Sequence, residues 1–225
     1  LLGQLSASIA HQLNQPLASI LGNAEAARKM LRREPLDLSE LRDIVDDIVA
    51  EDHRAAEVIR RLGALFRRSA PSFVPLDVNA LVRETVELTH TNLLLRHVTL
   101  ALALAPDLPT LEGDRVQLQQ MLLNLIVNAA DAMITMPDAD RVMTISSALE
   151  AGKIRVCVAD RGPGIPAAAM DKLFEPFWTT KAEGMGIGLA VCRSIVAAHQ
   201  GTLGVENAPE GGAVFCARLP ARATP

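Results

Sequence analysis

The sequence predicts an α+β protein in which an N-terminal helical hairpin precedes an α/β sandwich, a mostly antiparallel sheet covered on one face by helices. Three observations favour this fold class. Residues 1–33 and 38–68 carry apolar side chains at steps of three and four, which is the helical period. Two prolines, Pro71 and Pro75, then interrupt this pattern. Beyond them, stretches of helical and of alternating period are mixed without a strict strand–helix–strand order.

The two long helices are joined by a short turn at residues 34–37, so we expect them to pack antiparallel, with Asp37 or Ser39 capping the second. One hairpin cannot bury both apolar stripes on every side. We therefore expect it to pair with a second copy into a dimeric four-helix bundle. The alternative is a hairpin covered by the rest of its own chain. The predicted organisation is a hairpin domain over 1–69, a linker over 70–77 and an α/β domain over 78–225.

The α/β domain can be divided into elements by its hydrophobic period. A β-hairpin is expected to turn at Ala151 and Gly152, between two alternating runs. The predicted helices cover 77–94, 114–136, 166–173 and 186–199, and the predicted strands cover 98–104, 141–149, 153–160, 202–207 and 213–219.

Composition narrows the classes of function. Apolar residues make up 49% of the 225, aromatic residues only 3%, so aliphatic side chains must fill the core. A net charge of −4 argues against nucleic acid as a partner. The sequence contains no run of about 18 apolar residues, so it predicts no membrane-spanning helix. Cys157, Cys192 and Cys216 lack metal-ligand spacing, and we expect buried, reduced thiols and a cytoplasmic location. Because the chain starts at Leu in mid-helix, we expect it to be a fragment lacking an upstream part.

The stretch from Ser8 to Leu17 places a histidine on the polar side of the first helix. His11 lies two residues from both Ile9 and Leu13, so it falls on the opposite side of the helix from them and should face water. Pro16 leaves one carbonyl without its donor and should bend the helix near His11. Taken alone, this pattern also fits an ordinary surface histidine beside a kink.

The predicted helix at 118–132 is almost wholly apolar except for three polar residues on one face. Asn124, Asn128 and Asp131 are spaced i, i+4 and i+7. Burying an unpaired amide costs roughly 1–3 kcal/mol, so these side chains need partners. Amide oxygens suit Mg²⁺, which binds few protein ligands and completes its shell with water and phosphate oxygens. The alternative is an internal hydrogen-bond network.

Three further stretches carry groups that suit a nucleotide. Asp160 ends a strand beside Gly162 and Gly164, where a carboxylate can accept a hydrogen bond from an exocyclic amine. Lys181 closes an aromatic stretch at 174–178 and can reach phosphates. Three glycines then lead into a helix whose amide N–H groups favour an anion, and that run comprises Gly184, Gly186, Gly188 and Leu189. The run fits neither the Walker A pattern nor the dinucleotide fingerprint.

Taken in this order and spacing, the motifs resemble those of the sensor histidine kinases of two-component systems. Residues 118–132, 160–165, 174–181 and 184–189 look like the N, G1, F and G2 boxes of that family's catalytic ATP-binding domain. That domain has the fold shared with DNA gyrase, Hsp90 and MutL, known as the GHKL or Bergerat fold. Residues 8–17 resemble the H box of the dimerisation and histidine-phosphotransfer domain, in the subgroup written His-Glu-Leu-Asn-Gln-Pro-Leu.

The resemblance implies a role for each matching residue. His11 would be the phosphoacceptor, Asn128 the Mg²⁺ ligand and Asn124 a neighbour of the phosphates, on the stripe shared with Asp131. Asp160 would bind the adenine amine, in a pocket shaped by Gly162 and Gly164. The triphosphate would meet Lys181 and the amides of 184–188, under a short lid at about 182–185. ATP and Mg²⁺ are the implied cofactors, and the implied partners are a second copy of the chain and the receiver domain of a response regulator.

One residue departs from the family pattern. The family has an acidic residue after the phosphoacceptor, and this chain has Gln12, which cannot accept a proton. We expect slow autophosphorylation as a result. Gln15 stands where the family places a residue that orients water for dephosphorylating the regulator, so phosphatase activity is also expected. The other classes considered are a related ATPase, a nucleotide-binding pseudokinase and a dimeric signalling scaffold.

Overall fold

The computed structural model describes residues 2–32, 37–66, 72–181 and 186–222. Within the two N-terminal helices it leaves the side chains of 2–13, 53–54 and 56–66 undescribed. The chain divides into two compact units, Leu1–Arg68 and Ser69–Pro225, here called the N-terminal unit and the C-terminal unit.

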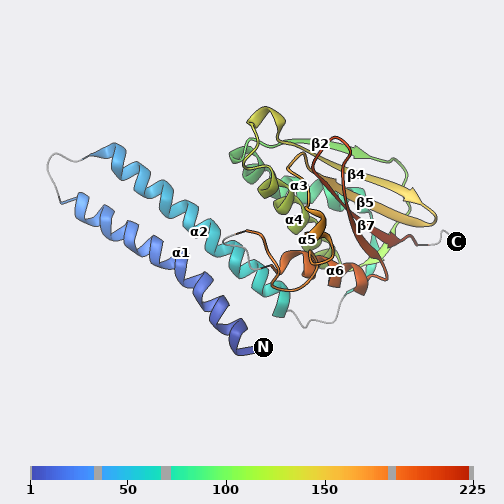
Figure 1. Ribbon diagram of the computed structural model, residues 1–225, viewed down its shortest axis with the longest axis horizontal. Helices are drawn as coiled ribbons and strands as arrows, with labels where there is room; N and C mark the ends of the chain where they lie inside the picture. The colour runs from blue at the N-terminus through green and yellow to red at the C-terminus, as the bar shows by residue number, and fades with distance from the viewer. Residues whose placement is uncertain (1, 33–36, 67–71, 182–185, 223–225) are drawn as a thin grey trace. The chain divides into compact units, whose positions relative to one another are not determined.

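The N-terminal unit is a hairpin of two long helices, α1 (Leu2–Met30) and α2 (Leu38–Phe66), which run side by side in opposite directions (Figure 1). The Asp37 carboxylate accepts hydrogen bonds from the amides of Ser39 and Glu40, at 2.9 and 3.1 Å, so it caps α2 as predicted. Pro16 lies inside α1. Several large apolar side chains of this unit are exposed, namely Leu17, Leu21, Leu31, Leu38, Val45 and Val49.

The C-terminal unit contains a five-stranded sheet in the order β2-β4-β5-β7-β6. The β2–β4 pair is parallel and the other three pairs are antiparallel, which confirms the mostly antiparallel sheet. The strands are β2 (Thr99–Leu104), β4 (Val142–Glu150), β5 (Lys153–Ala159), β6 (Thr202–Asn207) and β7 (Ala213–Pro220).

Helices cover one face of this sheet, as predicted (Figure 1). They are α3 (Val78–Leu95), α4 (Arg115–Ala132) and α6 (Gly188–Ala198), whereas the short α5 (Ala167–Met170) contributes no residue to the core beneath them. Asp77 caps α3 and Asp114 caps α4, each by accepting a hydrogen bond from the amide three residues on. The aliphatic core lies between helices and sheet and includes Leu81, Leu118, Leu125, Ile126, Ile145, Ile154 and Val158.

The structure differs from the prediction in several short segments, and one of them is α5, which ends at Met170 rather than near 173. Strand β1 (Val74–Leu76) pairs with β3 (Leu111–Gly113), so the second half of the predicted linker at 70–77 is a strand. Three residues are too few to show an alternating period, and the prolines concealed this strand. The turn after α4 is followed by a short 3₁₀ helix, η1 (Asp138–Asp140), and α4 itself ends at Ala132 rather than near 136.

The prediction that all three cysteines are reduced is wrong for two of them. Cys157 on β5 and Cys216 on β7 lie directly opposite each other in the antiparallel ladder and form a disulfide. Sequence alone could not place two cysteines 59 residues apart in the same register. Cys192 is a free, buried thiol as predicted, and burial raises its pKa to about 12, so it stays protonated.

Candidate functional site

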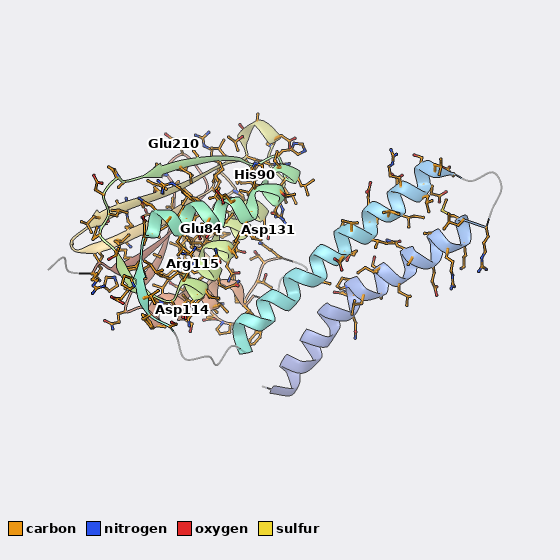
Figure 2. The ribbon with its side chains drawn as sticks, turned by 180° about the vertical axis from the view of Figure 1, so that it is seen from behind. Glu84, His90, Asp114, Arg115, Asp131 and Glu210 are labelled. Carbon is orange, nitrogen blue, oxygen red and sulfur yellow. A yellow bond between two sulfur atoms is a disulfide. The ribbon has the colours of Figure 1, made fainter. Side chains whose placement is uncertain are left out.

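The polar stripe of α4 lies on the side of the helix that the core leaves open. Asn124, Asn128 and Asp131 are partly exposed, whereas residues on the opposite side of the helix, among them Leu122 and Ile126, are almost fully buried. Figure 2 shows Asp114 and Asp131 at the two ends of α4. The helix therefore buries its apolar face in the core and leaves the polar stripe partly exposed.

Lys181 reaches this stripe from a segment fifty residues further along the chain. Its Nζ lies 2.5 Å from Asp131 Oδ2 and donates a 3.3 Å hydrogen bond to Asn128 Oδ1. Arg96 pairs with the other carboxylate oxygen of Asp131. Burial acts to raise the pKa of Asp131, but the Lys181 ammonium and the Arg96 guanidinium outweigh it, so this pKa lies below its usual value.

Asp160 follows the last residue of β5 and is buried, with 4% of its surface exposed. The amides of Gly162 and Ala213 both donate to its Oδ1, at 2.8 and 3.2 Å. Within the described residues, no hydrogen bond goes to Oδ2. Burial raises the pKa of Asp160 above its usual value, although the two amide hydrogen bonds favour the charged form. One oxygen therefore fixes the carboxylate, and the other is available to a ligand.

The glycine loop after Asp160 lies against the end of α4. A Cβ on Gly162 would lie 3.0 Å from the carbonyl oxygen of Ala132, so a side chain there would be tight and its neighbours would have to move slightly. Gly164 has a φ of +73°, in the left-handed region. Asn207, at the end of β6, holds the loop in place: its side chain accepts from the amide of Ile165 at 2.8 Å and donates to the carbonyl of the same residue at 2.9 Å.

The start of α6 completes the site. Among the described residues, no side chain caps its first turn, in contrast to α3 and α4, so the amides there can donate to an anion. The side chain of Asn124 donates to the carbonyl of Gly188 at 3.4 Å, which brings this end of α6 against the stripe. Gly186 has a φ of +63° just before it. Leu189 packs partly buried against the core, and Gly184 lies outside the described residues.

Each of the three predicted nucleotide-binding stretches thus contacts α4. Gly162 approaches Ala132, Lys181 pairs with Asp131, and Gly188 bonds Asn124. Sequence reasoning missed Arg96 and Asn207, because each acts on a residue more than thirty positions away and belongs to no recognisable motif.

The predicted phosphoacceptor region belongs to the N-terminal unit. His11 and Gln12 lie within α1, and their side chains are outside the description. Gln15 is described and exposed. The predicted outward direction of His11 therefore stays a prediction.

Two family models match the chain. The model for the His Kinase A (phospho-acceptor) domain matches residues 1–71, and the model for the histidine kinase-, DNA gyrase B- and HSP90-like ATPase matches residues 113–223. The two domains follow one another in the predicted order. The chain belongs to the sensor histidine kinases.

Individual members of the family agree with this assignment. The sensor histidine kinase TmoS of Ectopseudomonas mendocina is 36% identical over 221 residues, which are 97% of this chain and 23% of TmoS. The C4-dicarboxylate transport sensor protein DctS of Rhodobacter capsulatus is 36% identical over 219 residues, 97% of this chain and 33% of DctS. The chain therefore spans a third or less of the length of these two relatives.

Solved histidine kinases show the same fold. The nucleotide-free catalytic domain of ThkA is 32% identical with a TM-score of 0.59, covering 66% of this chain and 97% of that one. A structure of ThkA in complex with the response regulator TrrA is 25% identical with a TM-score of 0.68, covering 98% of this chain and 62% of that one. In the part of our chain that the structure describes, no helix combines the length and apolar character needed to cross a bilayer.

Proposed function

We propose that this chain is an ATP-dependent protein histidine kinase, which transfers the γ-phosphoryl group of ATP to His11. The observation that carries the proposal is the meeting of the three glycine- and lysine-bearing stretches on the polar face of α4. Membership of the family and the ATP-binding domain model support the use of ATP.

The residues divide between the two ends of the nucleotide. In this proposal the free Oδ2 of Asp160 accepts the hydrogen bond from the adenine amine, and Gly162 and Gly164 shape the surrounding loop. Lys181 and the open amides at the start of α6 meet the triphosphate, together with the glycines at 184, 186 and 188. Phosphoryl transfer needs positioning and neutralisation of charge rather than covalent help, and these groups supply both.

The stripe of α4 also suits a magnesium ion. Asn128 Oδ1 already faces a cation, since the Lys181 ammonium lies 3.3 Å away. Within the described ranges, no three His, Cys, Asp or Glu side chains gather into a metal site. A single amide oxygen, that of Asn128, is enough for Mg²⁺, because this ion takes one or two protein oxygens and completes its octahedron with water and phosphate oxygens. When bound there through Asn128, the ion would neutralise charge on the phosphates.

Gln12 bears on the rate of the reaction. A carboxylate after the phosphoacceptor could orient the imidazole and accept its proton, and a glutamine amide cannot accept it. We therefore expect Gln12→Glu to raise the rate of autophosphorylation by about tenfold or more, measured as phosphohistidine formed per minute. An unchanged rate would exclude this role for position 12.

The proposed partners are a second copy of the chain and a response regulator. The exposed apolar side chains of the hairpin, such as Leu21 and Val45, support a dimeric four-helix bundle. The complex of ThkA with a response regulator supports that class of partner. Since ATP is the phosphoryl donor, we place the reaction in the cytoplasm.

The exposed amide of Gln15 is proposed to orient water for phosphatase activity toward the regulator. If Gln15→Ala and the parent remove phosphate from the regulator at equal rates, this role is excluded.

Incubation with γ-labelled ATP and Mg²⁺ tests the proposed function. The kinase account predicts a label on the protein that is lost in acid, as a phosphohistidine is, and that is absent from His11→Ala. A related ATPase would release labelled phosphate without labelling the protein. A nucleotide-binding pseudokinase or a dimeric scaffold would do neither, and either of these results would refute the proposal.

A further inference from the structure

Asp131 is paired with two cations at once. Lys181 holds one carboxylate oxygen and Arg96 the other, and both ion pairs are partly shielded from water. One negative charge thus faces two positive charges, which leaves one unit of positive charge beside Asn128. A simple Lys181–Asp131 pair would have been neutral.

The fold holds Arg96 in place through a second arginine. Arg96 caps the end of α3, and its carbonyl accepts a 2.9 Å hydrogen bond from Arg141. The same guanidinium donates to the carbonyls of Ile134 and Met136, each at 2.9 Å, in the turn that follows α4. Arg141 therefore fixes the end of α3 to the end of α4, and with it the approach of Arg96 to Asp131.

Lys181 is held less firmly than Arg96. About half of its side chain is exposed, 44% against 23% for Arg96, and its described hydrogen-bond partners through Nζ are Asp131 and Asn128 alone. If an anion approaches, the exposed ammonium can leave Asp131 while Arg96 stays. The cost of that departure is small as long as another cation neutralises the carboxylate.

We propose that Arg96 is a positioning residue for phosphate binding: by neutralising Asp131 it keeps the Lys181 charge available to the triphosphate. The inference rests on the proposed ATP site and adds a residue and a role to it. Without Arg96, Asp131 would hold Lys181 in a closed ion pair and would place an uncompensated negative charge beside the phosphates. Arg96 itself contacts Asp131 and needs no contact with the nucleotide.

A second ion pair between the same two helices serves as a control for a purely structural role of Arg96. Arg115, at the start of α4, pairs with Glu84 of α3, and Figure 2 shows these two side chains pointing toward one another. This pair also joins α3 to α4, but it lies toward the other end of α4 from Asp131. Removing the Arg115 charge should therefore affect stability alone.

The test measures the affinity of the C-terminal site for the non-hydrolysable ATP analogue AMPPNP with Mg²⁺, and for AMP, by calorimetric titration of the whole chain. We expect Arg96→Gln to weaken AMPPNP binding by about fivefold and to leave AMP binding unchanged. Arg115→Gln should change neither. Adding Asp131→Asn to Arg96→Gln should restore most of the lost affinity, because Lys181 then has no carboxylate to leave.

Equal AMPPNP affinities in the parent and Arg96→Gln would overturn this inference alone, as would an equal loss of AMP binding or the same loss in Arg115→Gln. Absence of AMPPNP binding in the parent would overturn the proposed function as well. If Arg96→Gln does not fold, as judged by its circular dichroism, the AMPPNP affinity of the single variant Asp131→Asn tests the inference instead. The inference predicts AMPPNP affinity at least equal to that of the parent, and a clear loss would contradict it.

Discussion

Two aspartates of the C-terminal unit lie in opposite electrostatic surroundings. Asp131 is flanked by Arg96 and Lys181, which lower its pKa against the effect of burial. Asp160 faces no cation among the described residues, and burial raises its pKa although two amides donate to it. The first carboxylate is therefore stabilised in its charged form by folding, and the second is destabilised.

The two residues should change the pH dependence of stability in opposite directions. A lowered pKa means that the unfolded chain binds more protons, so the contribution of Asp131 is present above its usual pKa of 3.8 and is lost as pH falls through the folded value. For Asp160 the sign reverses, and its contribution is lost as pH rises above 3.8 through the raised value. Denaturant unfolding of Asp131→Asn and Asp160→Asn between about pH 3 and pH 7 measures both.

Relative to the parent, Asp131→Asn should become less stable as pH rises through this range, and Asp160→Asn should become more stable. Parallel pH profiles for the two variants would contradict the opposite surroundings that the structure gives these carboxylates.

Residues that belong to a local pattern could be predicted from the sequence. Asn124, Asn128 and Asp131 could be placed together because helical spacing puts them on one face. The pairing of Asp131 with Arg96, 35 residues before it, depends on how the ends of α3 and α4 meet. The spacing of residues in the sequence does not reveal that the ends of these two helices lie together, so this ion pair could not be predicted.

Among the elements, the entry into α6 depends on a close backbone approach. Gly186 has a φ of +63°, and its carbonyl accepts a 2.9 Å hydrogen bond from the amide of Phe177. A Cβ at Gly186 would lie 2.5 Å from backbone atoms of both Phe177 and Trp178. The aromatic stretch and the glycine run are thus held against each other, with Lys181 between them in sequence.

Gly186→Ala should be much more costly than Gly152→Ala. Gly152, in the β4–β5 turn, also has a positive φ, +74°, but a Cβ added there would meet no atom within 4 Å beyond its chain neighbours. Its replacement carries only the conformational cost, about 1 kcal/mol. At Gly186 the backbone clash adds to that cost, for a total of about 3 kcal/mol or more. Thermal unfolding and AMPPNP titration of both variants check this; equal destabilisation would show that the backbone can move apart at Gly186.

The longer elements could be predicted because each presents a full period of buried side chains. The helix α4 and the β4–β5 hairpin are clear examples, with the two-residue turn at Ala151 and Gly152. The β1–β3 pair was missed, since each strand has three residues and β1 contains a proline. Such short strands form through pairing with a distant partner, which a local pattern does not reveal.

For the whole molecule, the disulfide covalently links two neighbouring strands of the sheet, β5 and β7, that are distant in the sequence. Cys157 and Cys216 close a loop of 59 residues that includes the Asp160 corner, Lys181 and all of α6. Neither cysteine belongs to the core between helices and sheet, because alternation along β5 and β7 turns both toward the opposite face.

Closing a loop of this length should stabilise the folded chain by about 4 kcal/mol on the chain-entropy model. Alkylation in denaturant should modify Cys192 alone before reduction and all three cysteines after it. Reduction should lower the unfolding midpoint of the parent and leave that of the Cys157→Ser/Cys216→Ser variant unchanged. Three reactive thiols without reductant would contradict the disulfide.

The proposed function requires that the polar face of α4 binds the metal and the phosphates of ATP. Its most direct test is a titration of AMPPNP into the parent and Asn128→Ala, each with and without Mg²⁺. We predict that Mg²⁺ strengthens binding to the parent by at least about tenfold and has little effect on Asn128→Ala. The same Mg²⁺ dependence in both proteins would show that the metal and the phosphates bind elsewhere.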